Sequence, residues 1–252
     1  MLRFLIQRWK QGYKTFPFPA KAPVLPERFR GLPEIDQTKF SDGGNGSIQA
    51  CPTAAIFRDG EKLSLDLGRC LFCAQCQAAA PEGAIRFTRE YRMAARQKDD
   101  LVLRENTVKL AAALEEKTRK LFGRSLQLRQ VSAGGCNGCE SDVNVLNTLV
   151  YDLGRHGIQF VASPRHADGL LVTGAVTENM RLALEKTYEA VPSPKIVIAV
   201  GACAISGGPY IDHAEVLNGV ANVIPVDLYI PGCPPHPYTI LDGLLRLLGK
   251  IS

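Results

Sequence analysis

The pattern of apolar and polar positions divides the chain into two differently organised parts. In the first part, short β-rich runs separated by polar loops predict strands at residues 55–57, 63–66 and 85–87. In the second part, apolar runs alternate with segments of helical periodicity. They predict strands at 126–131, 158–162, 170–173, 196–200 and 223–230, and helices at 143–155, 178–190 and 238–248. Such alternation is typical of an α/β fold with a doubly wound parallel sheet, which we expect over residues 125–252.

Between these parts, a charged stretch predicts a helix at residues 105–122. Its apolar positions are spaced for one helical face, and Glu116 and Lys120 are opposite charges four residues apart. Gly123 follows, where a glycine commonly ends a helix. We therefore expect a helical linker at residues 101–124.

The composition is typical of a globular protein, and the charge distribution limits the kinds of partner that the chain can bind. Of its 252 residues, 46% are hydrophobic and 22% are charged. No apolar run approaches the roughly 20 residues that span a bilayer, and the opening residues lack the cleavage site of a secretory signal. The formal net charge of +5 comes with scattered basic residues and no nucleic-acid-binding motif, which excludes nucleic acid as the partner. We expect the protein in the cytoplasm or on the cytoplasmic face of a membrane.

The first ten residues combine apolar and basic side chains. The apolar ones are Leu2, Phe4, Leu5 and Trp9, and the basic ones are Arg3, Arg8 and Lys10. This mixture predicts either a segment that lies on a membrane surface or docks on a membrane subunit, or an ordinary packed N-terminus. Residues 1–30 are accordingly assigned as an N-terminal docking segment.

Eight cysteines carry the most specific chemical signal in the chain. In a cytoplasmic protein they are more often metal ligands or redox groups than disulfides. Four lie before residue 80 and four after residue 135: Cys51, Cys70, Cys73, Cys76, Cys136, Cys139, Cys203 and Cys233. This distribution predicts two sites in two parts of the chain.

An internal repeat explains the first four cysteines. Residues 50–56 recur as residues 79–85, an offset of 29 residues between two copies of a C-x2-C-x2-C-x3-C-P unit. In two-cluster ferredoxins built from this unit, the fourth cysteine of each copy binds the cluster of the other copy. One complete ligand set is therefore Cys51, Cys70, Cys73 and Cys76, whereas the other set is replaced by Ser41, Gly44, Ser47 and Ala80.

This pattern predicts a ferredoxin-like α+β domain at residues 31–100 that keeps one of its two [4Fe-4S] clusters. All the losses fall on one cluster, and the ligand set of the other closes at four cysteines. A zinc site on the same cysteines is the alternative.

The other four cysteines follow predicted strands. Cys136 and Cys139 come after the first strand of the second part, Cys203 after residues 196–200 and Cys233 after residues 223–230. Because the carboxyl ends of parallel strands meet at one edge of a sheet, we expect these cysteines to converge. The prediction is a second [4Fe-4S] cluster. A redox dithiol of Cys136 and Cys139 and a zinc site are the alternatives.

Two resemblances to known families cover nearly the whole chain. Residues 1 to about 100 resemble the ferredoxin-like subunit of formate hydrogenlyase and related group 4 membrane-bound hydrogenases, in Met1-Leu2-Arg3-Phe4, Phe29-Arg30-Gly31 and Leu67-Gly68-Arg69-Cys70-Leu71-Phe72-Cys73. Residues 125–252 resemble the small subunit of the same [NiFe] enzymes and the complex I subunit that holds the cluster next to quinone. The matching stretches are Gly135-Cys136-Asn137-Gly138-Cys139-Glu140, Ser163-Pro164-Arg165-His166-Ala167-Asp168, Gly201-Ala202-Cys203 and Ile230-Pro231-Gly232-Cys233-Pro234-Pro235.

The spacing in the first cysteine loop resembles the hydrogenase side of this family. Asn137 and Gly138 separate Cys136 from Cys139, whereas complex I counterparts typically have two adjacent cysteines there.

The resemblance implies an oxidoreductase subunit whose catalytic centre is on a partner chain. Two [4Fe-4S] clusters would relay electrons to or from the catalytic large subunit of a membrane-associated, group 4 hydrogenase-like complex. Other iron–sulfur or membrane subunits would be further partners and would hold the chain on the inner face of the cytoplasmic membrane. A complex I-like role without hydrogen chemistry and a zinc-stabilised structural subunit are the alternatives.

Four polar residues near the second cysteine set have two interpretations each. Glu140 and Asp142 would either carry protons or stabilise the start of the following helix. By resemblance, Arg165 and His166 would face the large subunit; otherwise they would form a structural ion pair. The histidines His156, His213 and His236 are not assigned as ligands, because the cysteine sets are already complete.

Overall fold

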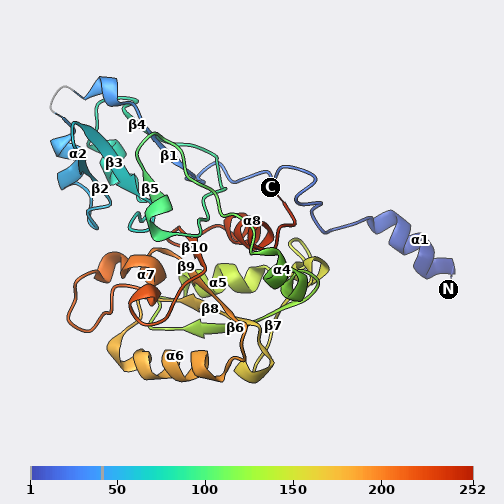
Figure 1. Ribbon diagram of the computed structural model, residues 1–252. Helices are drawn as coiled ribbons and strands as arrows, with labels where there is room; N and C mark the ends of the chain where they lie inside the picture. The colour runs from blue at the N-terminus through green and yellow to red at the C-terminus, as the bar shows by residue number, and fades with distance from the viewer. Residues whose placement is uncertain (1, 41–42, 252) are drawn as a thin grey trace.

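The second part of the chain folds around a five-stranded parallel sheet, as its apolar runs predict (Figure 1). The computed structural model describes residues 2–40 and 43–251. The strands are β6 (Leu126–Ser132), β7 (Ile158–Phe160), β8 (Gly169–Thr173), β9 (Ile196–Val200) and β10 (Leu228–Ile230). They lie in the order β10-β9-β8-β6-β7, and every neighbouring pair is parallel. The winding direction reverses between β6 and β8, which is where open α/β sheets assemble their sites.

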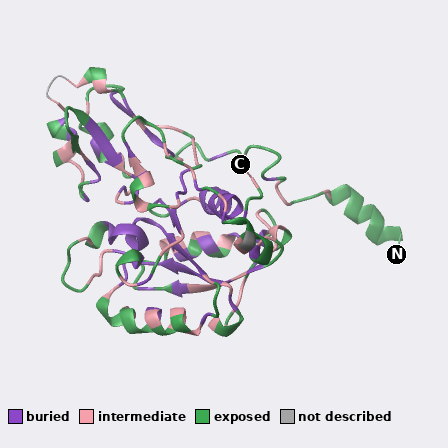
Figure 2. Cartoon of the chain, in the orientation of Figure 1, coloured by how far each residue is buried: buried purple, intermediate pink, exposed green. Residues whose placement is uncertain are grey.

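Helices cover both faces of this sheet, so the prediction of a doubly wound sheet is confirmed. Alternate strand residues point to opposite faces, and the buried apolar side chains accordingly form two groups. One group includes α6 (Glu178–Ala190) and α7 (Ala202–Ser206). The other includes α4 (Glu116–Phe122), α5 (Gly138–Val145) and α8 (Pro237–Leu247), and every residue of α8 is buried (Figure 2).

The first part of the chain follows the 29-residue repeat. One copy contains β1 (Pro33–Ile35), α2 (Asn45–Gln49) and β2 (Ile56–Asp59), and the other contains β3 (Lys62–Asp66), α3 (Gln75–Ala78) and β4 (Ile85–Phe87). Strand β1 pairs antiparallel with β4, and β2 pairs antiparallel with β3, so that each pair takes one strand from each copy. Strand β5 (Val102–Leu103) adds to β3.

A hydrogen bond joins two positions that the repeat makes equivalent. The Ser47 hydroxyl donates to the Cys76 carbonyl oxygen over 3.1 Å, and the two residues are 29 positions apart. Ser47 is buried at this contact. Ser41, another position at which the repeat lacks a cysteine, lies outside the described residues.

Short 3-10 helices complete the described structure. They are η1 (Gln37–Lys39), η2 (Lys98–Leu101), η3 (Leu153–His156), η4 (Pro164–His166), η5 (Gly208–Tyr210) and η6 (Val220–Asn222). In the described ranges, no helix has both the length and the apolar character needed to cross a bilayer.

The helix predicted at residues 105–122 is wrong over most of its length, because only α4 (Glu116–Phe122) is helical. Asn106 has a φ of 56°, and its side-chain amide exchanges two hydrogen bonds with the backbone of Ile35. The Ala111 backbone N–H donates to a carbonyl of the preceding part of the chain. These groups serve tertiary contacts, so they are not available for a helical ladder.

Two other predicted elements differ in their bounds. The helix expected at 143–155 is α5, which begins and ends earlier, at Gly138 and Val145. Asn137, directly before it, takes a left-handed conformation and marks its start. The strand expected at 223–230 is confined to β10. Asp227, which precedes β10, accepts a hydrogen bond from Val197 through its carboxylate.

Backbone and side-chain contacts join the two parts. Ala95 and Tyr229 exchange two backbone hydrogen bonds of 3.0 and 2.9 Å, which extend the β10 edge of the sheet. The Ser206 hydroxyl of α7 lies 2.9 Å from the Gly68 carbonyl oxygen. One group of buried apolar residues includes members of both parts. The domain limits at residues 30, 100 and 124 stay a prediction.

Candidate functional site

The second cysteine set gathers at the carboxyl edge of the parallel sheet. Cys136 and Cys139 follow β6, Cys203 lies in α7 directly after β9, and Cys233 follows β10. Burial raises the pKa of Cys139, and the nearby thiols of Cys203, Cys233 and Cys136 raise it further. Burial and the same neighbourhood raise the pKa of Cys203 to about 12. Four thiols from three separate segments therefore lie close together.

Two glycines let the backbone approach these sulfur atoms. Gly201 has a φ of 90°, and a Cβ atom there would lie 2.4 Å from the Cys139 Sγ. At Gly208 a Cβ atom would lie 2.8 Å from the Cys203 Sγ. A side chain at either position would occupy the space beside a sulfur, so both loops require glycine.

Glu140, next to Cys139, is a buried bridge between two strands. Its Oε1 accepts hydrogen bonds from the hydroxyls of Ser132 (2.6 Å) and Thr173 (2.8 Å), which end β6 and β8. Burial alone would raise the pKa of this carboxyl, but the two hydroxyl donors outweigh it and lower the pKa. Glu140 therefore joins the strands at the switch point, a role that sequence reasoning missed because neither hydroxyl is near it in the chain.

The first cysteine set surrounds a small pocket in the ferredoxin-like repeat. Cys51, Cys70, Cys73 and Cys76 all line this pocket. Burial, followed by the charges of the other three thiols, raises the pKa of Cys70, and burial raises the pKa of Cys76 to about 11. Two backbone N–H groups point at the sulfurs: Ala55 donates to the Cys51 Sγ (3.1 Å) and Phe72 donates to the Cys70 Sγ (3.3 Å).

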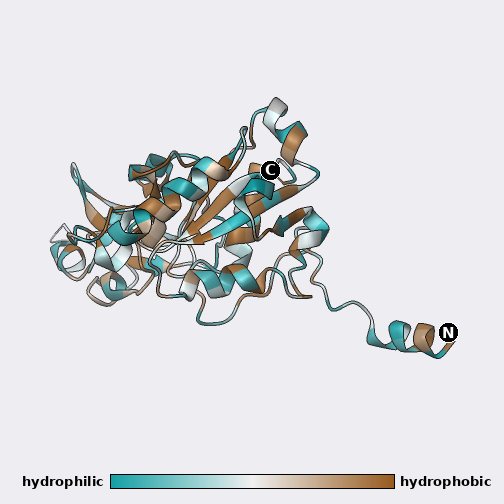
Figure 3. Ribbon diagram, turned by 90° about the horizontal axis from the view of Figure 1, so that it is seen from below, coloured by the Kyte–Doolittle hydropathy of each residue, from teal (hydrophilic) through white to brown (hydrophobic). Residues whose placement is uncertain are grey.

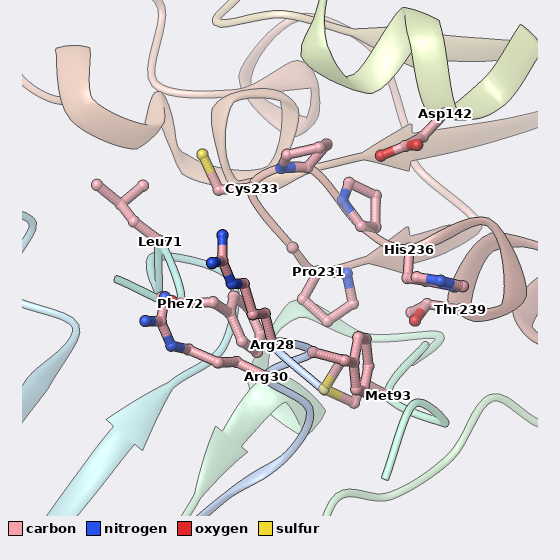
Figure 4. A pocket seen from close by; sticks show the side chains of 14 residues that line it. Arg28, Arg30, Leu71, Phe72, Met93, Asp142, Pro231, Cys233, His236 and Thr239 are labelled. Atoms are coloured by element: carbon pink, nitrogen blue, oxygen red, sulfur yellow. Dashed lines mark hydrogen bonds between the residues drawn. The ribbon is translucent and has the colours of Figure 1, made fainter. Parts of the chain in front are cut away.

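The two sets approach each other through Cys73 and Cys233. The Cys73 thiol is close enough to Cys233 to contribute, after burial and Cys136, to the raised pKa of Cys233. Phe72, beside Cys73, and Cys233 line one pocket, and Figure 4 shows Arg28 reaching toward Cys233. Arg30 lines the same pocket and donates to the Phe72 carbonyl oxygen over 3.1 Å.

None of the eight cysteines forms a disulfide. Cys73, Cys136 and Cys233 are exposed, whereas Cys70, Cys76 and Cys203 are buried. Over residues 2–40 and 43–251, no three cysteine, histidine or carboxylate side chains form a group that could hold a single metal ion.

The remaining predicted polar residues lie at the edges of the site. Asp142 is half-buried beside the pocket that contains Cys233, and burial raises its pKa. Arg165 and His166 lie on η4 at the surface, and both are exposed.

Comparison with known proteins places the second part of the chain in a family. Residues 136–247 match the family model described as NADH ubiquinone oxidoreductase, 20 Kd subunit. The chain is 43% identical over 141 residues to formate hydrogenlyase subunit 7 of Escherichia coli, a match that covers 56% of this chain and 55% of that protein. It therefore spans about half the length of that relative.

Two shorter relatives are covered more fully. A probable membrane-bound hydrogenase subunit, mbhJ, of Pyrococcus furiosus is 43% identical over 133 residues, covering 53% of this chain and 80% of that protein. A subunit of the NADH-quinone oxidoreductase of Bacteroides thetaiotaomicron is also 43% identical over 133 residues, covering 52% of this chain and 66% of that protein.

Among solved structures, a chain of the archaeal membrane-bound sulfane sulfur reductase is similar, with 37% identity and a TM-score of 0.47 over 54% of this chain and 76% of that chain. Since four fifths of the hydrogenase subunit from Pyrococcus furiosus is matched at 43% identity, the chain belongs to the family of the NADH:ubiquinone oxidoreductase 20 kDa subunit, which these hydrogenase and quinone-oxidoreductase subunits share.

Proposed function

We propose that this chain is an electron-transfer subunit that relays electrons through two [4Fe-4S] clusters to or from the catalytic large subunit of a group 4 hydrogenase-like complex. One observation carries the proposal: eight free cysteines are grouped as two sets of four, and Cys73 of one set lies near Cys233 of the other. The first cluster would be held by Cys51, Cys70, Cys73 and Cys76, and the second by Cys136, Cys139, Cys203 and Cys233.

The residues at both sites fit such clusters. A cubane presents one iron to each thiolate at four separate corners, so its ligands stand farther apart than the ligands of one ion. Backbone N–H groups already point at Cys51 and Cys70, and glycine makes room beside Cys139 and Cys203. In the absence of iron, burial favours the neutral thiols. Iron binding would displace the thiol protons and stabilise the thiolates.

Each cluster, when bound, supplies a site for one transferable electron. The chain's own groups would set the potential of that site through N–H donors to sulfur, burial and local charge. Arg28 and Arg30 line the pocket that contains Cys233, where positive charge would favour the reduced, more negative cluster.

The exposure of three cysteines supports the proposal that a partner subunit binds over this part of the surface. Cys73, Cys136 and Cys233 are exposed in the isolated chain, and a partner that covers them would exclude water from the relay. Relatives carry names of hydrogenase and formate hydrogenlyase subunits, which supports a large hydrogenase-like subunit near Cys136 and Cys233. Such partners would also hold the chain on the inner face of the cytoplasmic membrane.

A complex I-like role is the second candidate, because relatives named as NADH-quinone oxidoreductase subunits match equally well. The two-residue spacing between Cys136 and Cys139 favours the hydrogenase role. The sequence of the large subunit encoded beside this chain separates the two: two C-x2-C pairs able to hold nickel support the hydrogenase role, and their absence supports transfer to quinone.

An anaerobic reductive titration tests the relay. The purified chain is expected to take up about two electrons, one per cluster, and to release them reversibly on oxidation. The reduced protein should give EPR signals broadened by interaction between the two centres. Uptake of no electrons would exclude a redox role.

Gly201→Ala is expected to remove about half of the bound iron and sulfide. Its Cβ atom would lie 2.4 Å from the Cys139 Sγ, in a backbone conformation with a φ of 90°. The matched control is Gly60→Ala, which also has a positive φ, 63°, but has no atom within 4 Å of the new methyl group. Iron analysis of both variants checks the prediction, and equal iron contents would contradict it.

A further inference from the structure

The N-terminal helix stands away from the rest of the molecule. Helix α1 (Leu2–Gln11) has no buried residue, and Figures 1 and 3 show it projecting from the body in both views. Its large apolar side chains are unusually exposed for a packed helix, with Trp9 84% and Leu2 73% accessible. Exposed apolar surface of this kind normally marks a contact surface.

Four of the five large apolar side chains of α1 share one face, and Phe4 lies outside it. Leu2, Leu5, Ile6 and Trp9 follow the i, i+3, i+4, i+7 spacing of a helical stripe. The basic side chains Arg3 and Lys10 flank one edge of the stripe, and Arg8 flanks the other. An apolar face bordered on both sides by cations is typical of a helix that lies in the plane of a membrane surface.

The net charge of the whole chain is concentrated around this helix. Residues 1–26 hold five of the 30 basic residues and no acidic residue, which leaves 25 basic against 25 acidic residues in the rest of the chain. The chain's formal charge of +5 therefore lies entirely in its first 26 residues. Such a polybasic segment complements an anionic surface.

The segment after α1 is fixed to the body. The Phe16 N–H donates to the Val150 carbonyl oxygen (2.9 Å), and Arg155 donates to the Phe16 carbonyl oxygen (2.6 Å). Phe18 is buried against Tyr238, with 5.3 Å between ring centroids. The body therefore holds the base of the helix while α1 itself is left for an outside partner.

We infer that α1 binds an anionic lipid surface, lying in the headgroup region with Leu2, Leu5, Ile6 and Trp9 toward the acyl chains. This binding would be a direct contact of the chain with the bilayer, in addition to any contact through partner subunits. It does not depend on the iron–sulfur clusters.

The position of the only tryptophan makes the test specific. Trp9 is the single tryptophan of the chain, so its emission reports on α1 alone. Full-length protein is mixed with vesicles of phosphatidylcholine, or of phosphatidylcholine and phosphatidylglycerol. With the anionic vesicles we expect a blue-shifted emission, quenching by brominated acyl chains, and co-flotation of the protein. With the neutral vesicles, the emission shift, the quenching and the co-flotation should all be small.

Matched variants separate this contact from general adhesion. Lys10→Gln is expected to weaken partitioning about fivefold, whereas Lys62→Gln, an exposed lysine on β3, should leave it unchanged. Leu5→Gln is expected to weaken partitioning roughly tenfold or more, whereas Leu182→Gln on α6, where the leucine is 64% exposed against 60% for Leu5, should not. Unchanged Trp9 emission with anionic vesicles, equal binding to neutral vesicles, or equal effects of test and control variants would each overturn the inference.

Discussion

Replacing Cys203 with serine is expected to halve the iron and acid-labile sulfide of the anaerobically purified chain. Cys203 is buried in α7 and shares its surroundings with Cys139 and Cys233. A serine hydroxyl is a much poorer ligand for cluster iron than a thiolate, so the second cluster should be lost. The first cluster should remain, because its four cysteines lie in another part of the fold.

Cys70→Ser is the matched counterpart. Cys70 and Cys203 are similarly buried, at 6% and 9% exposure, but belong to different sets. Each single variant should lose a different EPR signal, and the double variant should lose both. Full iron content in either variant would remove that cysteine from the ligand set. Loss of all iron in one variant would mean that the two sites are not independent.

Arg246→Met is expected to lower the free energy of unfolding by about 3 to 5 kcal/mol at neutral pH, because it leaves a buried carboxylate without its partner. The Arg246 Nε donates to the Asp242 Oδ2 over 2.7 Å on α8, and the two side chains are only 7% and 2% exposed. The midpoint of anaerobic guanidinium unfolding measures the loss.

Arg181→Met is the control for this pair. Arg181 also pairs with an acid four residues away, Glu185, but that pair is exposed to solvent, so its loss should change the free energy of unfolding far less. Burial raises the pKa of Asp242, so the Asp242 carboxyl group binds its proton more tightly in the folded chain than in the unfolded chain. The free energy of unfolding of Arg246→Met should therefore fall as pH rises through the acidic range. The difference in this free energy between the variant and the unchanged protein should shrink toward low pH. A deficit independent of pH would contradict a buried charge as its cause.

The sequence predicts the parallel sheet well because its strands are continuous apolar runs. Residues 196–200 and 178–190 coincide with β9 and α6, since burial on both faces or on one helical face leaves a clear pattern. The linker helix is wrong because Asn106 bonds to Ile35, 71 residues away, and no local pattern encodes such a contact. Strand β1 was missed because three residues beginning with a proline give no periodicity.

For the candidate site, the internal repeat and the placement of cysteines directly after predicted strands indicate which thiols lie together. The repeat assigns Cys51 to the run at 70–76, and the pocket lined by all four agrees with that grouping. The approach of Cys73 to Cys233 could not be predicted, because it depends on how Gly68 packs against α7. Sequence likewise gives no sign that Glu140 links Ser132 to Thr173, since hydroxyl donors at strand ends have no characteristic spacing.

Iron and acid-labile sulfide analysis of the intact chain, purified without oxygen, tests the central claim most directly. Two closed four-cysteine sets predict about eight irons and about eight sulfides per chain, as two [4Fe-4S] clusters. A colourless protein that contains zinc and no acid-labile sulfide would contradict it.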